Sequence, residues 1–371
     1  MRLAVVVMLG ACRGEPSSPP GPAQLAEVSA LIEAQMELGH LPGVAVALVS
    51  RDEVAWTEGF GTSDLATGAP VTADTSFMLA SVSKTAVGAA VMQGRDEGWF
   101  TLDEPTPIGF DLRNPSFPDD PIPLRQLLTH TSSLADRWSV WRDLYVPGDS
   151  DIGMSEFVRG YFEPGGEWYD PDNFYVFAPG EQYRYANMGV TAAASALEVT
   201  AGEDFAAWCD DRLFAPLGMD HTAWHLQQLD ETEVAASYEW RNGDYVDFGR
   251  YGYPDYPDGG LRSSANDLAT WMRMWLGGGE VDGVRVLAAD TVAEMLTPQL
   301  TDVVDDQGLV LYSWDWHGCA VWAHEGSDSG VSTGMYLCPD RDLGLAVLTN
   351  GGWGDPEAFY AIAELLWAIA E

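Results

Sequence analysis

Lysine is almost absent from this chain of 371 residues. Lys84 stands alone, because the other 17 of its 18 basic residues are arginines. Acidic residues number 57, which gives a formal net charge of −39 at pH 7. A field of that sign repels phosphate backbones and anionic lipid headgroups, so we expect no nucleic-acid partner. We also expect that the one lysine serves chemistry that arginine cannot supply.

The apolar run at the N-terminus is too short to cross a bilayer, which takes roughly 20 residues. The run covers residues 3–9, and a Pro/Ser/Gly-rich stretch follows it through residue 22. This pattern is typical of an export signal and linker over residues 1–22. Leu9-Gly10-Ala11-Cys12 also resembles a bacterial lipoprotein box, in which Cys12 carries a lipid anchor. We expect an exported protein of the cell envelope or periplasm, with lipidation left open.

Cysteine is scarce as well, at four residues, and no spacing resembles a zinc site. His221 and His225 stand four residues apart but lack the glutamate of an HExxH motif, so we expect neither metal nor cofactor. Cys319 and Cys338 end two apolar runs, and a hairpin between these runs would bring them together. Whether they form a disulfide stays open at this point. Cys209, in an amphipathic stretch, is expected to be a buried thiol.

Helices at both chain ends, with strands just inside them, favour an α/β (α+β) fold in which the terminal helices cover one antiparallel sheet. Helical spacing predicts a helix over residues 23–38, and Asp355 is the expected N-cap of a second helix over the last 16 residues. Strands are predicted at 43–50, 53–60, 309–314, 319–324, 331–338 and 343–350. The predicted sheet domain comprises residues 23–101 and 300–371, with a mainly helical domain inserted at 102–299.

Within that inserted segment, Ser264 begins a capping pattern ahead of a helix. Two aromatic and acidic stretches, 138–177 and 238–256, are expected to be long ordered loops. Their aromatic side chains either form a lid over a site or only pack on the helical domain. The residues concerned are Trp138, Trp141, Trp168, Tyr169 and Phe174.

The lone lysine lies in Ser81-Val82-Ser83-Lys84, ahead of a small-residue helix. Residues three apart on a helix project from one face, so Ser81 and Lys84 can touch. A serine hydroxyl needs a neighbouring base to act as a nucleophile, and burial can lower the pKa of a lysine enough for it to serve. By itself SxxK is a weak four-residue pattern.

Two later motifs strengthen the case, namely Tyr185-Ala186-Asn187 and His324-Glu325-Gly326. In this order, SxxK, YxN and a K/HxG strand resemble the serine β-lactamase and penicillin-binding protein superfamily, in its class C branch, which also includes DD-carboxypeptidases, D-aminopeptidases and esterases. Four further segments share the resemblance: Leu127-Leu128-Thr129-His130-Thr131-Ser132, Pro216-Leu217-Gly218-Met219, Gly259-Gly260-Leu261-Arg262-Ser263-Ser264 and Leu348-Thr349-Asn350.

The resemblance implies a sheet domain, an inserted helical domain and an active site in the crevice between them. Ser81 would be the nucleophile that becomes acylated. Lys84 and Tyr185 would share the base work, with the phenol held as phenolate or as a proton relay. Asn187 would offer its amide to the substrate carbonyl.

The resemblance also assigns the third motif. His324 would stand in place of the motif's cation or relay. The backbone N–H groups of Ser81 and of Ser327, just past Gly326, would form an oxyanion hole. Glu325 departs from the usual threonine, and we expect it to repel the carboxylate of a β-lactam or of a peptide C-terminus.

These observations predict a serine hydrolase that forms an acyl-enzyme on a small-molecule ester or amide or on a peptide. Esterase-like and DD-peptidase-like activities rank above true β-lactam hydrolysis. A catalytically retired binding protein of the envelope is the remaining alternative, although intact Ser81, Lys84, Tyr185 and Asn187 argue against it. An α/β-hydrolase is disfavoured because no G-x-S-x-G elbow occurs.

Overall fold

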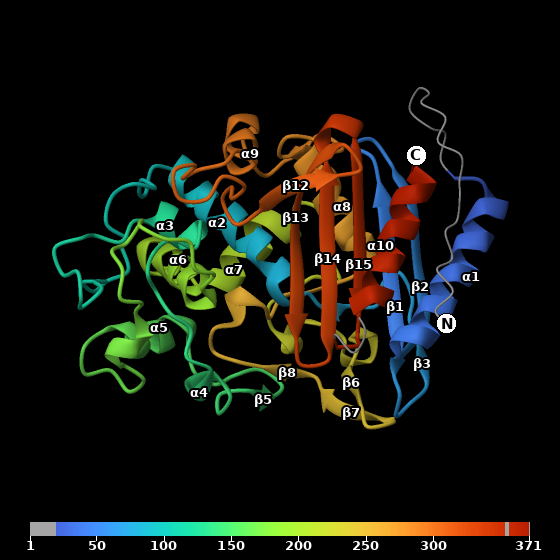
Figure 1. Ribbon diagram of the computed structural model, residues 1–371, viewed down its shortest axis with the longest axis horizontal. Helices are drawn as coiled ribbons and strands as arrows, with labels where there is room; N and C mark the ends of the chain where they lie inside the picture. Colours follow the sequence, from blue (N-terminus) through green and yellow to red (C-terminus); the bar gives the residue numbers. More distant parts are fainter. Residues whose placement is uncertain (1–19, 353–355, 371) are drawn as a thin grey trace.

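The structure is a computed structural model that describes residues 20–352 and 356–370. Its core is a seven-stranded antiparallel sheet in the order β12-β13-β14-β15-β1-β2-β3 (Figure 1). The strands are β12 Tyr312–Trp316, β13 Cys319–Asp328, β14 Val331–Cys338, β15 Leu343–Thr349, β1 Gly43–Val49, β2 Val54–Asp64 and β3 Ala69–Pro70. The predicted antiparallel sheet, drawn from both ends of the chain, is confirmed.

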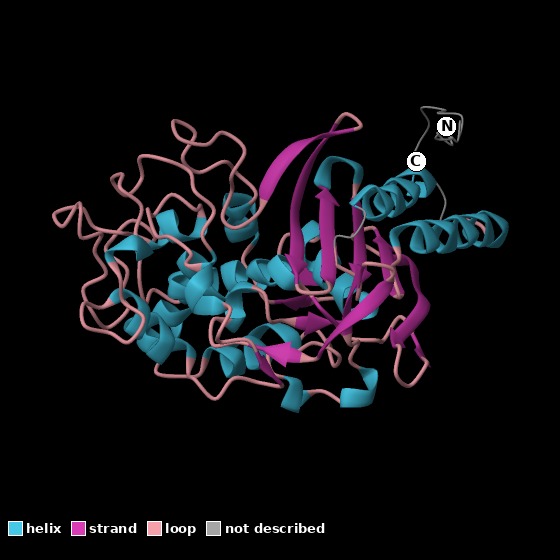
Figure 2. Cartoon of the chain, turned by 60° about the horizontal axis from the view of Figure 1, so that its bottom comes forward, coloured by secondary structure: helices cyan, strands magenta, loops and turns pink. Residues whose placement is uncertain are grey.

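The two terminal helices cover one face of this sheet. Helix α1 (Pro22–Gly39) and helix α10 (Pro356–Ala370) lie side by side against it (Figures 1 and 2). In β1, Val44 and Val46 pack with Ile32 and Ile362 of these helices. The intervening residues of β1 face the other side, so both faces of the strand are buried and its sequence is continuously apolar.

Helices and loops from the middle of the chain, coloured cyan to green, gather on the left in Figure 1, beside the sheet. Helix α8 (Ala265–Leu276) packs on β1 and β15, although it belongs to the predicted inserted segment 102–299. Its predicted start is confirmed, since the Ser264 hydroxyl accepts the Asp267 N–H at 3.1 Å. The remaining helices are α2 Lys84–Asp96, α3 Leu124–Leu128, α4 Trp138–Trp141, α5 Met154–Phe162, α6 Asn187–Ala201, α7 Phe205–Cys209 and α9 Ala289–Met295. The division into two domains at 102 and 299 stays a prediction.

The expectation of loops alone at 138–177 and 238–256 is wrong. The second stretch is mostly a hairpin of β6 (Ser237–Arg241) and β7 (Asp244–Gly249). Asn242 and Gly243, both at positive φ, form its turn, and this pair is a strong hairpin signal. The first stretch contains α4, α5 and a short strand. The short strand pairs are β4 Phe77–Met78 with β9 Arg262–Ser263, β5 Val146–Pro147 with β8 Tyr251–Gly252, and β10 Glu280–Val281 with β11 Val284–Arg285.

Cys319 and Cys338, whose pairing the sequence left open, form a disulfide across the β13–β14 hairpin. Cys209 is a buried free thiol, as predicted. Among the described residues, no helix has the length and apolar character needed to cross a membrane. The predicted export signal, Cys12 and the expected N-cap Asp355 lie outside the described residues.

Replacing both disulfide cysteines by serine is expected to lower the free energy of unfolding by about 3 kcal/mol, because the bridge closes a loop with a sequence separation of 19. Urea unfolding of Cys319→Ser/Cys338→Ser against the parent measures this difference. A reductant should destabilise the parent and leave the variant unchanged. Equal stability of the two proteins would contradict the prediction.

Candidate active site

Ser81 lies where a short strand leads into a buried helix. Strand β4 pairs with β9, the 3₁₀ turn η1 (Ala80–Ser83) follows, and α2 begins at Lys84. Ala80 has a φ of +45°, in the left-handed region that costs a residue with a Cβ of the order of 1 kcal/mol or more. This turn fixes the backbone immediately before the nucleophile, and it leaves Ser81 partly exposed while Lys84 is fully buried.

The predicted contact between serine and lysine is present. Lys84 Nζ lies 2.9 Å from Ser81 Oγ, and the amine also donates to the backbone carbonyl of Asp258. Burial lowers the pKa of Lys84 to about 8, against the opposing pull of nearby carboxyl groups, chiefly those of Asp258 and Asp136. About a tenth of the amine is therefore neutral at pH 7 and able to accept the serine proton.

Tyr185 completes the group from the loop before α6. Its ring is 37% exposed, while its hydroxyl end is enclosed beside Ser81. Lys84 Nζ lies 5.3 Å from the ring centroid. Burial raises the pKa of Tyr185 despite its hydrogen bond with the Ser81 side chain. Of the two forms that the resemblance allows, this environment favours the protonated relay over the phenolate.

Two buried histidines flank the Tyr185 ring. His130 stacks on it with ring centroids 4.2 Å apart, and the His324 ring is 6.3 Å away. Burial, with a further contribution from Lys84, lowers the pKa of His324 to about 3. His324 is therefore neutral at physiological pH, which does not fit a cationic role, and it packs beside Tyr185 rather than lining the cavity.

The backbone at Gly326 closes tightly over Ser81. A Cβ at Gly326 would lie 2.4 Å from Thr333 Oγ1 and 2.9 Å from the Ser81 nitrogen, so only glycine allows this approach. The Glu325 N–H donates to Tyr312 Oη, away from β14. N–H directions alternate along a strand, so the Ser327 N–H, two residues further on, also points away from β14. The pairing of β12 with β13 ends at Tyr312 and Ala323, so Ser327 lies beyond it. This geometry suits an oxyanion hole made by Ser81 and Ser327.

Ser81 opens into a cavity of about 440 Å³ that Asn187 and Ser327 also line. The aromatic residues of the 138–177 stretch divide between the two proposed roles. Trp138 and Trp141 line this cavity, and Trp138 is 59% exposed at its rim. Trp168, Tyr169 and Phe174 instead pack on the core of the helical part.

Asp136 is a site residue that the sequence argument missed. Its carboxylate accepts the backbone N–H groups of Asn187 at 2.8 Å and Met188 at 3.0 Å, which fixes the start of α6 and with it the Asn187 side chain. Burial raises its pKa to about 6. No local sequence signal identifies it, because its partners lie about 50 residues further along the chain.

The expectation that Glu325 faces the site is wrong. Its carboxylate accepts hydrogen bonds from Tyr336 Oη at 2.8 Å and Tyr360 Oη at 3.2 Å, on the side of the sheet that α10 covers. Side chains alternate between faces along a strand, and His324 takes the face toward Lys84. Glu325 therefore cannot repel a substrate carboxylate.

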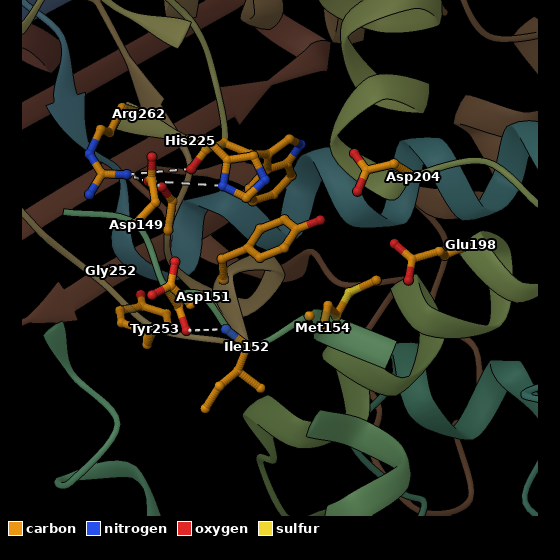
Figure 3. A pocket seen from close by; sticks show the side chains of 15 residues that line it. Asp149, Asp151, Ile152, Met154, Glu198, Asp204, His225, Gly252, Tyr253 and Arg262 are labelled. Carbon is orange, nitrogen blue, oxygen red and sulfur yellow. Dashed lines mark hydrogen bonds and ion pairs between the residues drawn. The ribbon is translucent and has the colours of Figure 1, made fainter. Parts of the chain in front are cut away.

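A second cavity, of about 180 Å³, lies beside the buried Arg262 (Figure 3). Two of its carboxylates hold backbone N–H groups: Asp149 accepts those of Leu226 and Gln227, and Asp204 caps α7. Arg262 donates to backbone carbonyls, including Gly260 O at 2.9 Å. These contacts give the second cavity a structural role, and its lining includes none of the predicted site residues.

Comparison with known proteins finds similarity over most of the chain. A family model described as Beta-lactamase matches residues 28–366. Penicillin-binding protein 4 of Amycolatopsis lactamdurans is 26% identical over 329 residues, covering 84% of this chain and 82% of that protein.

Two solved structures share the fold. The octameric penicillin-binding protein homologue from Pyrococcus abyssi gives a TM-score of 0.73 at 23% identity, covering 92% of this chain and 77% of the other. The penicillin binding protein from Bacillus halodurans gives 0.72 at 21% identity, covering 90% and 98%.

Gly326→Ala is expected to slow the reaction of Ser81 with a fluorophosphonate probe by about 100-fold, because the added methyl pushes β13 away from the Ser81 backbone and misplaces one oxyanion donor. Labelling rates from intact-protein mass spectrometry measure this change. Glu325→Gln is the matched control, since the neighbouring side chain lies on the far face, and its rate should stay within about twofold of the parent. Equal rates for Gly326→Ala and the parent would contradict the predicted oxyanion hole.

Proposed function

The chain belongs to the beta-lactamase family, and on that basis we propose that it is a serine hydrolase that forms an acyl-enzyme on Ser81 with an ester or amide substrate. The observation that carries the proposal is the 2.9 Å contact between Lys84 Nζ and Ser81 Oγ at the mouth of a cavity. The family shares a serine hydrolase fold, and the activities we propose within it are esterase-like or DD-peptidase-like.

In the first step, neutral Lys84 takes the Ser81 proton as Oγ attacks the substrate carbonyl carbon. Burial supports this role because it favours the uncharged amine. The bond between Oγ and carbon forms while the carbonyl electrons move to oxygen. The N–H groups of Ser81 and Ser327 then stabilise that oxyanion.

In the second step, the tetrahedral intermediate collapses and the bond to the leaving group breaks. Tyr185 donates its phenolic proton to the departing oxygen or nitrogen and regains one from Lys84. The raised pKa of Tyr185 supports this relay because the phenol holds its proton until the leaving group needs it. Water, deprotonated by the same groups, then releases the acyl chain from Ser81.

The cavity lining supports ester or amide hydrolysis over β-lactam hydrolysis. Asp255, Asp258 and Asp328 line the space next to Ser81 and oppose the carboxylate that a β-lactam or a peptide C-terminus carries, so within the proposal esterase-like activity ranks above DD-peptidase-like activity. A retired binding protein is not favoured, because the nucleophile, its base and the relay are in contact.

We also propose that the protein works outside the cytoplasm. The Cys319–Cys338 disulfide supports this location, since such bonds persist in oxidising compartments. The signal-like segment over residues 1–22 supports it too.

The activity is expected to rise with pH through the Lys84 pKa of about 8. On a p-nitrophenyl ester, kcat/KM should increase about tenfold per pH unit below 8 and level off above it, because only the neutral amine accepts the proton. Burial raises the pKa of Asp136 to about 6, so this carboxyl group is largely ionised before that plateau. A profile between pH 6 and 10 measures the trend, and a flat or falling limb between 7 and 8 would contradict it.

Lys84→Arg keeps the positive charge but cannot lose a proton, so we expect kcat to fall at least about 100-fold. Ser81→Ala should abolish both turnover and the acyl adduct seen by mass spectrometry. Turnover retained in Ser81→Ala would refute the proposed function, whatever the result for the lysine variant.

A further inference from the structure

Three carboxyl groups line the cavity next to Ser81 without a basic partner of their own. Asp255 and Asp258 belong to the turn at η6 (Tyr256–Asp258), and Asp328 is the last residue of β13. Asp255 and Asp258 are only 4% and 9% exposed. In the described part of the chain, no arginine, lysine or histidine forms an ion pair with any of these three. Lys84 is nearby, but its amine serves the nucleophile.

The three groups are held in place by neutral partners. Asp328 accepts hydrogen bonds from Tyr145 Oη and Tyr253 Oη, each at 3.1 Å, and from the Ser329 N–H at 2.6 Å. The carboxyl groups of Asp255 and Asp258 hydrogen-bond each other and so share a proton. With that proton in place the pair carries one negative charge, and ionised Asp328 carries a second.

Glu239 also lines the cavity but does not add to that charge. Arg241 forms a bidentate ion pair with it, with N···O distances of 2.6 and 2.5 Å. Of the acidic residues that line the cavity, Asp255, Asp258 and Asp328 are thus the ones without an ion-pair partner in the described part of the chain.

Buried carboxylates are costly unless a cation compensates them. The cavity walls suit a cation, because Trp138, Trp141, Tyr145 and Tyr253 present aromatic rings beside the carboxyl groups. The indole N–H of Trp141 is buried and has no hydrogen-bond partner in the described part of the chain, although Trp141 lines the cavity.

We propose that the cavity selects substrates that carry an ammonium group, and that Asp328 with the Asp255–Asp258 pair recognises it. The substrate class is thus a cationic ester or amide, with its carbonyl at Ser81 and its positive charge a few atoms away. This inference rests on the proposed function and refines its substrate.

The test compares two substrates that differ in charge alone. p-Nitrophenyl 4-(trimethylammonio)butanoate is cationic, and p-nitrophenyl 5,5-dimethylhexanoate replaces its nitrogen by carbon. A second pair, acetylcholine and 3,3-dimethylbutyl acetate, moves the charge to the leaving group. For each pair, kcat/KM for the cationic ester is divided by kcat/KM for the neutral ester. This ratio is then divided by the ratio of the rates at which hydroxide hydrolyses the same two esters, which corrects for their intrinsic reactivity. Assays in 1 M NaCl, where the Debye length is about 3 Å, suppress the field of the whole chain.

We expect the parent to prefer the cationic member of at least one pair by about tenfold or more. Asp328→Asn and Asp255→Asn should each reduce that ratio by about tenfold, while Asp340→Asn, which removes an equal charge at an exposed turn, should leave it unchanged. Two different variants guard against a local folding defect in one of them, and thermal unfolding checks both.

The outcomes separate the two proposals. Turnover that depends on Ser81, with no cationic preference in either pair, overturns the inference and leaves the hydrolase intact. A preference that falls equally in Asp340→Asn also overturns it, because the overall charge would then be the cause. Turnover that persists in Ser81→Ala refutes the hydrolase itself.

Discussion

The contact between the buried amine of Lys84 and the hydroxyl of Ser81 is the interaction on which the proposed chemistry depends. Lys84 is fully enclosed at the start of α2, with Ser81 and the Asp258 carbonyl as its hydrogen-bond partners. An ammonium at such a depth is costly, and the fold balances that cost with carboxyl groups contributed by distant segments. The balance leaves the pKa of the amine close to neutral pH, which is the condition under which a lysine serves as a general base.

The acidic residues of the chain act most strongly inside the cavity. Most of the 57 acidic residues of the chain set a field that salt screens within about 8 Å. Inside the cavity, a few carboxyl groups act at short range, where solvent screens them less. They raise the pKa of Lys84, and they line the cavity in which we propose that the substrate binds. The same charges thus bear on both the base and the choice of reactant.

Much of the architecture follows from local patterns. The terminal helices and the strands of the sheet are predicted because each buries a face with a recognisable period, or both faces, as in β1. Ser81 and Lys84 are found because they are three residues apart on one turn. The β6–β7 hairpin is predictable from the sequence, because Asn242-Gly243 is a turn signal. The aromatic composition of the stretch instead favours the prediction of a loop.

Other features depend on tertiary structure. Asp136, Asp258 and Asp328 are far apart in the chain, and only the packing of η6, β13 and α6 brings them toward Lys84. The direction of Glu325 was misjudged although strand alternation, applied to His324, places it on the opposite face. Acidic side chains do line the cavity beside Ser81, but they are Asp255, Asp258 and Asp328 and not Glu325.

The pKa of Lys84 tests the account most directly, and the scarcity of lysine makes it accessible. A protein grown with [6-¹³C]lysine gives one side-chain resonance, because the chain has a single lysine. If the amine is buried as described, its titration by NMR should give a pKa of about 8. In Ser81→Ala this pKa should rise only slightly. A value at or above the ordinary 10.4 would mean that the amine stays charged at working pH, and it would contradict the proposed base.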